Sequence, residues 1–219
     1  PFSNIYAGEI QCPSLGIDVD VFDENGNSTK VGENGELVIK KPFPSMPVMF
    51  WNDKSEDKIL KAYFKKYKNI WHHGDYIQKT KNGGYIIYGR SDSTLKPGGV
   101  RIGTSEIYRQ VESFDEILES IVVGQNYQDD IRIILFIKLA SGCIFSKELE
   151  DKIKKKIRTN CSPRHIPSKI IVCPDIPRTK SNKIVEVAVR KIINGDKIDN
   201  FEALANPESL EFFKKLKIR

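Results

Sequence analysis

The first ninety residues alternate short runs of β type with turns. Residues 17–22 place apolar and polar side chains in strict alternation, and the Asn25-Gly26 pair behind them favours a tight turn. Residues 53–67 carry apolar side chains at helical spacing, with Asp53 as a candidate N-cap. The pattern predicts strands over residues 17–22, 36–40, 76–78 and 84–88, the last two forming a hairpin. This part of the chain is therefore expected to be rich in β-structure.

The pattern changes after Asp92, where helices and strands are mixed. Ser146 can cap a helix whose residues Leu149, Ile153 and Ile157 form an apolar stripe. The Asn206-Pro207 pair favours the start of a short helix in the tail. The predicted helices cover 104–112, 146–160 and 184–194, and the predicted strands cover 119–124, 131–139 and 170–172. Such a mixture over about a hundred residues is typical of a compact α+β domain.

The positive charge is carried by the second part alone. Residues 1–92 contain 12 Lys/Arg and 12 Asp/Glu, whereas residues 93–219 contain 23 and 17, which accounts for the net charge of +6. A basic module suits a polyanion such as ATP, and nucleic acid is the competing partner. The simplest alternative is a solvated, lysine-rich surface.

Cysteine and histidine usage argues against a disulfide framework and against a metal site. The four cysteines are widely spaced, which favours a reducing cytosol. His72, His73 and His165 have no metal-ligand spacing, and no apolar run is long enough to span a bilayer. The start at Pro1 does not read as a signal peptide and is expected to be a cut inside a longer protein.

Three motifs occur in a fixed order along the chain. His73-Gly74-Asp75 comes first, Tyr88-Gly89-Arg90-Ser91-Asp92 through Lys96-Pro97-Gly98-Gly99-Val100-Arg101 follows, and Pro177-Arg178-Thr179-Lys180-Ser181-Asn182-Lys183-Ile184 comes last. Their order resembles the adenylate-forming (AMP-forming) acyl-CoA synthetases. Further stretches, among them Phe50-Trp51-Asn52-Asp53 and the tail 202–208, resemble the branch of that family that activates acetoacetate. The resemblance covers essentially the whole chain.

The resemblance implies a domain organisation and an activity. Residues 1–90 would be the β-rich end of a large N-terminal domain, 91–93 a hinge, 94–200 a mobile C-terminal lid domain and 201–219 a helical tail. The complete enzyme would use ATP, Mg²⁺ and coenzyme A to convert acetoacetate to its CoA thioester through an acyl-adenylate. The phosphate-binding loop and most of the acyl pocket would belong to the upstream domain, so these 219 residues alone are expected to be inactive.

Two residues are predicted to hold the nucleotide in the first part. A carboxylate at Asp75 can accept hydrogen bonds from both ribose hydroxyls, and the resemblance makes it the ribose ligand. The guanidinium of Arg90 suits ribose and phosphate oxygens. Without the resemblance, Asp75 would read as a turn residue and Arg90 as part of a structural salt bridge, with Asp92 as a candidate partner.

The second motif is expected to combine a pivot with a ligand passage. Asp92 is the predicted hinge, with torsional freedom permitted by Ser91 and Ser93. By resemblance, Arg101 approaches a phosphate, and Gly98 and Gly99 line the tunnel for the pantetheine arm of coenzyme A. Taken alone, the Pro-Gly-Gly segment would be only a turn.

Lys183 is the predicted catalytic residue. By resemblance, it neutralises charge while the carboxylate attacks the α-phosphate of ATP, and an oriented cation there can supply several kcal/mol of transition-state stabilisation. The alternative is one more solvated lysine. The basic run from Lys152 to Arg158 has no interleaved aromatic residues and reads as the wet face of a helix. Two other functions stay open: a ligase for acetate or propionate, and a non-catalytic basic module that binds nucleic acid or a partner protein.

Overall fold

The computed structural model describes residues 3–197 and 204–218. The chain divides into two units, Pro1–Asp92 and Ser93–Arg219. Each unit has its own sheet and its own apolar core. The mixture of helices and sheets confirms the predicted α+β class.

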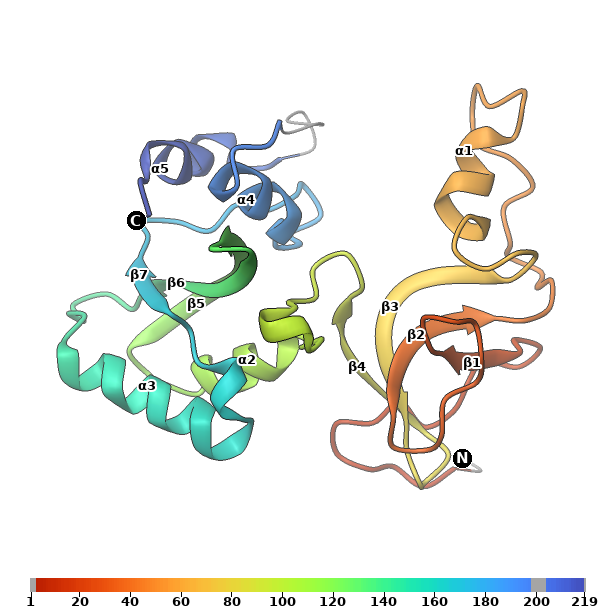
Figure 1. Ribbon diagram of the computed structural model, residues 1–219, viewed down its shortest axis with the longest axis horizontal. Coiled ribbons are helices and arrows are strands. Elements are labelled where there is room, and N and C mark those ends of the chain that lie inside the picture. Colours follow the sequence, from red (N-terminus) through yellow and green to blue (C-terminus); the bar gives the residue numbers. More distant parts are fainter. Residues whose placement is uncertain (1–2, 198–203, 219) are drawn as a thin grey trace. The chain divides into compact units, whose positions relative to one another are not determined.

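The first unit is built on a four-stranded antiparallel sheet with the order β1-β2-β3-β4 (Figure 1). The strands are β1 (Val19–Phe22), β2 (Asn34–Ile39), β3 (Trp71–Lys79) and β4 (Tyr85–Arg90). Each strand pairs with its neighbour in sequence, so the sheet is a simple meander. One face buries Val21, Ile77 and Tyr85.

Two predictions for this unit differ from the structure. Strand β3 begins at Trp71, so Asp75 lies inside a strand and not in front of one. The helix expected over residues 53–67 is short and irregular, with an α-helical turn α1 (Asp57–Ile59) followed by a π-helical turn (Leu60–Phe64). Asp53 is not its N-cap, because Glu56 occupies that position, but the Asp53 carboxylate accepts hydrogen bonds from the backbone amides of Lys58 and Ile59.

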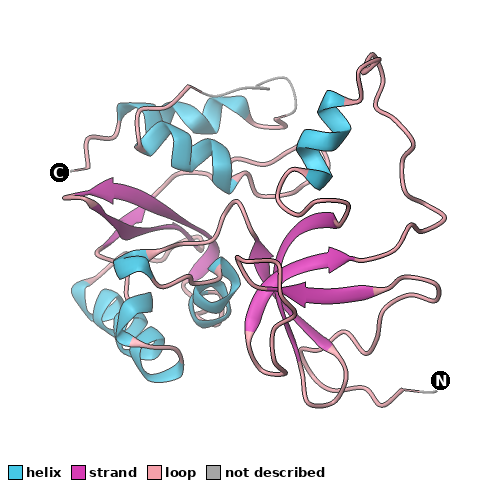
Figure 2. Ribbon diagram, turned by 45° about the vertical axis from the view of Figure 1, so that its right-hand side comes forward, coloured by secondary structure: helices cyan, strands magenta, loops and turns pink. Residues whose placement is uncertain are grey.

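The second unit has a three-stranded sheet with helices on both faces (Figure 2). Strands β5 (Ile117–Tyr127) and β6 (Asp130–Leu139) are antiparallel, and β7 (Lys169–Val172) runs parallel to β6. The helices are α2 (Thr104–Val111), α3 (Lys147–Asn160), α4 (Glu186–Ile193) and α5 (Leu210–Lys215). Ser146 caps α3 as predicted, accepting from the amide of Leu149 at 3.1 Å.

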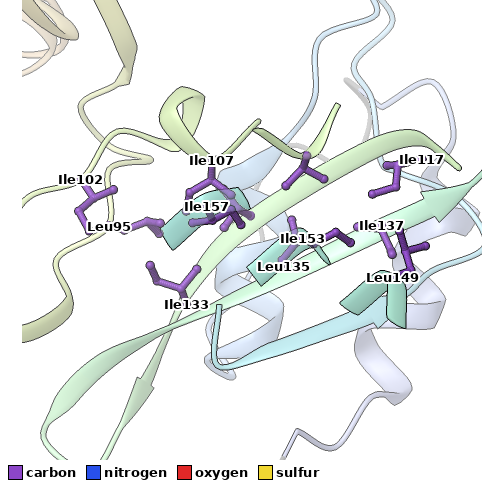
Figure 3. Close-up of a cluster of buried hydrophobic side chains, with 12 residues drawn as sticks. Leu95, Ile102, Ile107, Ile117, Ile133, Leu135, Ile137, Leu149, Ile153 and Ile157 are labelled. Atoms are coloured by element: carbon purple, nitrogen blue, oxygen red, sulfur yellow. The ribbon is translucent and has the colours of Figure 1, made fainter. Parts of the chain in front are cut away.

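The alternating side chains of β5 and β6 serve two separate cores. Ile133, Leu135 and Ile137 point to the face covered by α2 and α3, where Leu149, Ile153 and Ile157 pack against them (Figure 3). The intervening residues, such as Ile134 and Phe136, pack with α4 and α5. Burial on both faces explains why these strands read as nearly continuous apolar runs.

The tail packs on this same unit. Leu204, Leu210 and Phe213 are buried in the core that Phe136 shares with α4, and the Phe136 and Phe213 rings meet edge to face at 5.0 Å. The tail's first part, residues 201–203, lies outside the described residues. Asn206 precedes a 3-10 turn (Pro207–Ser209), but its side chain does not cap it. The tail helix therefore begins at the Asn206-Pro207 pair as predicted, with Asn206 in the N-cap position and its side chain bonded to a different segment.

Candidate nucleotide-binding and catalytic site

Asp75 and Arg90 are direct cross-strand partners on β3 and β4. Arg90 Nη1 lies 3.3 Å from Asp75 Oδ1, and His73 Nδ1 lies 2.5 Å from Asp75 Oδ2. The carboxylate is 16% exposed, whereas the guanidinium is 54% exposed. The carboxylate supplies hydrogen-bond acceptors and the neighbouring accessible guanidinium supplies donors. Ribose hydroxyls can bind to both kinds of group.

Gly74 gives room for this pairing. Its φ is +86°, a conformation that costs other residues energy, and a Cβ built on it would lie 2.8 Å from Arg90 Nη2. The missing side chain therefore leaves room for the guanidinium to lie over the strand. This is a physical reason for the glycine in His73-Gly74-Asp75 that the sequence pattern does not reveal.

Asp75 is held in its ionised form. Burial by itself would raise the pKa of this carboxyl, but the hydrogen bond from His73 and the positive charge of Arg90 outweigh burial and lower the pKa below its ordinary value. The group is therefore an acceptor at neutral pH.

Asp92 ends the first unit and lies close to the same pair. Its Oδ1 is 3.8 Å from Arg90 Nε, so the salt bridge considered for Arg90 is present alongside the one to Asp75. Both neighbouring serines make contacts in the structure, and the hinge at Asp92 stays a prediction. Ser91 donates a hydrogen bond to Glu36, and Ser93 is buried.

Glu36 is a residue of this region that the sequence reasoning missed. It is 1% exposed and lies beneath the Arg90–Asp92 segment. Its carboxylate binds Lys66 Nζ at 2.6 Å, His72 Nε2 at 2.9 Å and the hydroxyl of Ser91. A charged side chain two residues before the buried Val38, on the same face of β2, was the available signal.

The loop before α2 presents its glycines at an exposed tip. Leu95 and Ile102 are buried and pair through both backbone hydrogen bonds, which pins the base of the loop. Gly98 and Gly99 have φ of +57° and +76°, and a Cβ on either would meet nothing within 4 Å. Arg101 Nε donates to Thr94 Oγ1 at 2.9 Å. The left-handed backbone conformation favours glycine at both positions, and the missing side chains leave open space around the tip.

Lys183 lies in a tight turn between β7 and α4. Thr179 N donates to Lys183 O at 2.8 Å, and Lys183 N donates to Thr179 Oγ1 at 3.0 Å. Asn182 adopts a φ of +63° at the corner of the turn. The Lys183 side chain is exposed, and no described residue forms a hydrogen bond or an ion pair with its ammonium group. A cation on a pinned turn, without a partner in the described chain, can reach out to a ligand.

Two of the five cations in the basic run of α3 pair with glutamates one turn earlier in the helix. Lys152 pairs with Glu148 at 2.6 Å, and Lys154 pairs with Glu150 at 2.5 Å. Lys156 binds Ser113 and lies over the Phe114 ring. These contacts favour the wet face of a helix over a nucleic-acid patch.

The predicted site residues fall into three groups. Asp75, Arg90 and Asp92 are brought together in the first unit, whereas the Gly98–Arg101 loop and the Lys183 turn are separate parts of the second. Among the described residues, no group of three or more His, Cys, Asp or Glu side chains is arranged to hold a metal ion. The described ranges also contain no helix long and apolar enough to cross a membrane.

Comparison with known proteins assigns the class. No family model matches the chain. A benzoate CoA ligase from Burkholderia xenovorans superimposes with a TM-score of 0.71 and 28% identity, over 85% of this chain and 36% of that one. With its sheet flanked by helices, the chain has the fold of a part of the AMP-forming CoA ligases, a part that spans about a third of their length.

Within that class, the chain is similar to acetoacetyl-CoA synthetases. The protein of that name from Rhizobium meliloti is 53% identical over 216 residues, covering 99% of this chain and 33% of the relative. The acetoacetyl-CoA synthetase from Streptomyces lividans superimposes with a TM-score of 0.90 at 41% identity, over 96% of this chain and 32% of that one. The chain thus spans about a third of the length of the relatives it matches.

Proposed function

We propose that this chain is the C-terminal part of an acid–thiol ligase that forms acetoacetyl-CoA. The complete enzyme would join acetoacetate to ATP, releasing pyrophosphate, and then transfer the acetoacetyl group from the adenylate to coenzyme A, releasing AMP. The observation that carries the proposal is the 53% identity over 99% of the chain to an acetoacetyl-CoA synthetase. The substrates are ATP with its Mg²⁺, acetoacetate and coenzyme A, and the upstream domain of the same protein is the required partner. Four free thiols suit a reducing cytosol.

In this proposal the first unit holds the nucleotide. The ionised Asp75 accepts hydrogen bonds from the ribose hydroxyls, and Arg90 donates to ribose or phosphate oxygens. Support comes from the half-buried carboxylate with its lowered pKa and from the exposed guanidinium 3.3 Å away. Asp92 would be the pivot about which the second unit changes its position between the two half-reactions.

In this proposal the second unit supplies positive charge to the reacting groups and borders the path of coenzyme A. Lys183 would stabilise the approach of the acid carboxylate to the α-phosphate, because a cation offsets the repulsion between two anions. Arg101 would contact a phosphate, and Gly98 and Gly99 would border the path of the pantetheine arm. These roles are supported by the exposure of Lys183, whose ammonium has no partner within residues 3–197 and 204–218, and by the open space at both glycines.

The substrate is tested by acid-dependent ATP–pyrophosphate exchange with the complete gene product. Acetoacetate, acetate and propionate are compared at equal concentration. Strongest exchange with acetoacetate supports the proposal, whereas strongest exchange with another acid keeps the ligase and changes its substrate. Absence of exchange with all three would contradict the ligase and favour a basic binding module.

The role of Lys183 is tested with a matched neighbour. Lys180 is exposed on the same turn, so Lys180→Ala removes an equal charge from nearly the same place. We expect Lys183→Ala to abolish adenylate formation but to spare thioester formation from supplied acyl-adenylate, and Lys180→Ala to change both by less than about threefold, about 0.6 kcal/mol. Retained adenylation in Lys183→Ala would refute the assignment.

A further inference from the structure

The tail runs beside the turn that carries Lys183. Leu204 forms a β-bridge with Thr179, and Ala205 N donates to Arg178 O at 2.8 Å. These backbone contacts join the tail to the first residues of the turn, more than twenty positions earlier in the chain. The tail is therefore in direct contact with the support of the proposed catalytic lysine.

Asn206 makes the strongest side-chain connection between the two segments. Its Oδ1 accepts from Arg178 N at 2.8 Å, and its Nδ2 donates to Asp175 Oδ2 at 2.6 Å and to Ile176 O at 3.0 Å. An asparagine amide offers both an acceptor and two donors, and all three capacities are used here. Neither aspartate nor serine can reproduce this set.

The side chain of Arg178 carries the connection into the turn. Its Nη1 donates to the backbone carbonyl of Asn182 at 2.9 Å, next to Lys183, and its Nη2 pairs with Glu119 on β5. Asp175, which accepts from Asn206, also forms an ion pair with Lys138, whose Nζ lies 2.7 Å from Asp175 Oδ1. The two ends of the Lys183 turn are thus tied to the sheet and to the tail by charged and amide groups.

We propose that Asn206 and Arg178 are positioning residues that fix the turn carrying Lys183 for adenylate formation. The proposal rests on the role of Lys183 proposed above. Lysine has a flexible stem, so its ammonium is aimed only as well as its backbone is held. A displacement of about 1 Å at a reacting group can cost on the order of a hundredfold in rate.

The test uses Asn206→Ala in the complete enzyme, with the two half-reactions measured separately. We expect adenylation kcat to fall about tenfold or more, whereas thioester formation from supplied acyl-adenylate stays within about twofold. Asn194→Ala is the matched control. Asn194 also uses three side-chain hydrogen bonds, to Gly124 O, Arg190 O and Asn126 N, but it lies at the end of α4. Asn194→Ala should lower the free energy of unfolding by about as much as Asn206→Ala does. Its adenylation kcat per folded enzyme should stay unchanged.

A second variant guards against misfolding. Arg178→Lys keeps a positive charge beside Glu119 but cannot also reach the Asn182 carbonyl, and it should show the same selective loss. Equal loss of both half-reactions, or unchanged adenylation in either variant, would overturn the positioning role. If Lys183→Ala itself retains adenylation, the proposed function of the lysine fails. If only Lys183→Ala loses adenylation, the lysine assignment stands and the positioning role alone fails.

Discussion

Replacement of Glu36 tests how much the buried carboxylate stabilises the first unit. Glu36→Gln keeps the volume of the side chain but removes the charge that faces Lys66 and His72. Breaking a fully buried pair costs about 3–5 kcal/mol. Lys66, however, is 35% exposed and can turn to water, so the stranded groups are mainly His72 and the hydroxyl of Ser91. We therefore expect a loss of about 1–3 kcal/mol for Glu36→Gln.

Tryptophan emission measures this loss in one unit only. Both tryptophans of the chain are in the first unit, and Trp71 is 7% exposed and stacked on Tyr63 at 3.6 Å. Trp51 is 90% exposed, so the change on unfolding comes chiefly from Trp71. With a urea dependence of about 1–2 kcal/mol per molar, a 2 kcal/mol loss lowers the urea midpoint by about 1–2 M.

The control is Glu33→Gln, at an exposed turn before β2. Within the part of the chain that the structure describes, the Glu33 carboxylate accepts only a local bond from the amide of Lys30, so the unfolding free energy of this variant should stay within about 0.5 kcal/mol of the unaltered chain. An unchanged midpoint for Glu36→Gln would show that the buried carboxylate contributes no net stability. An equal shift in the control would show that the effect reflects net charge and not the buried contacts.

Three further outcomes are expected. Folding lowers the pKa of Asp75, so the ionised carboxylate stabilises the folded first unit fully at pH values above its ordinary pKa of 3.8. This contribution is lost as the pH falls through the lowered pKa of the folded state, and Asp75→Asn should therefore make the urea midpoint less dependent on pH in the acid range. Asp92→Pro fixes φ at the proposed pivot and should impair one half-reaction more than the other in the complete enzyme, whereas equal losses would remove the hinge assignment. Burial raises the pKa of Cys173 to about 12, so iodoacetamide at pH 8 should modify the exposed Cys12 and leave Cys173 intact until urea is added, as peptide mass spectrometry would record. Labelling of Cys173 at the same rate in the native chain would contradict its burial.

Local pattern was a good guide to the elements of this chain. The apolar stripe and serine cap of α3 predicted both its start and its end, because helix formation depends on residues three and four apart. The alternation in β1 places Val19 and Val21 together in one core cluster, and the long apolar runs of β5 and β6 reflect burial on both faces. The helix expected near Asp53 failed, since only a short α-turn and a π-turn form there.

The sequence by itself determined most of the strands and helices, the order of the three motifs and the family that they resemble. Only the tertiary structure decided that Asp75 faces Arg90 across two strands, that Glu36 lies beneath Ser91, and that Asn206 accepts a hydrogen bond from Arg178. These partners lie fifteen or more residues apart in the chain. Their contacts depend on strand register and on the path of the tail, which are set by the packing of the whole unit and not by any local periodicity.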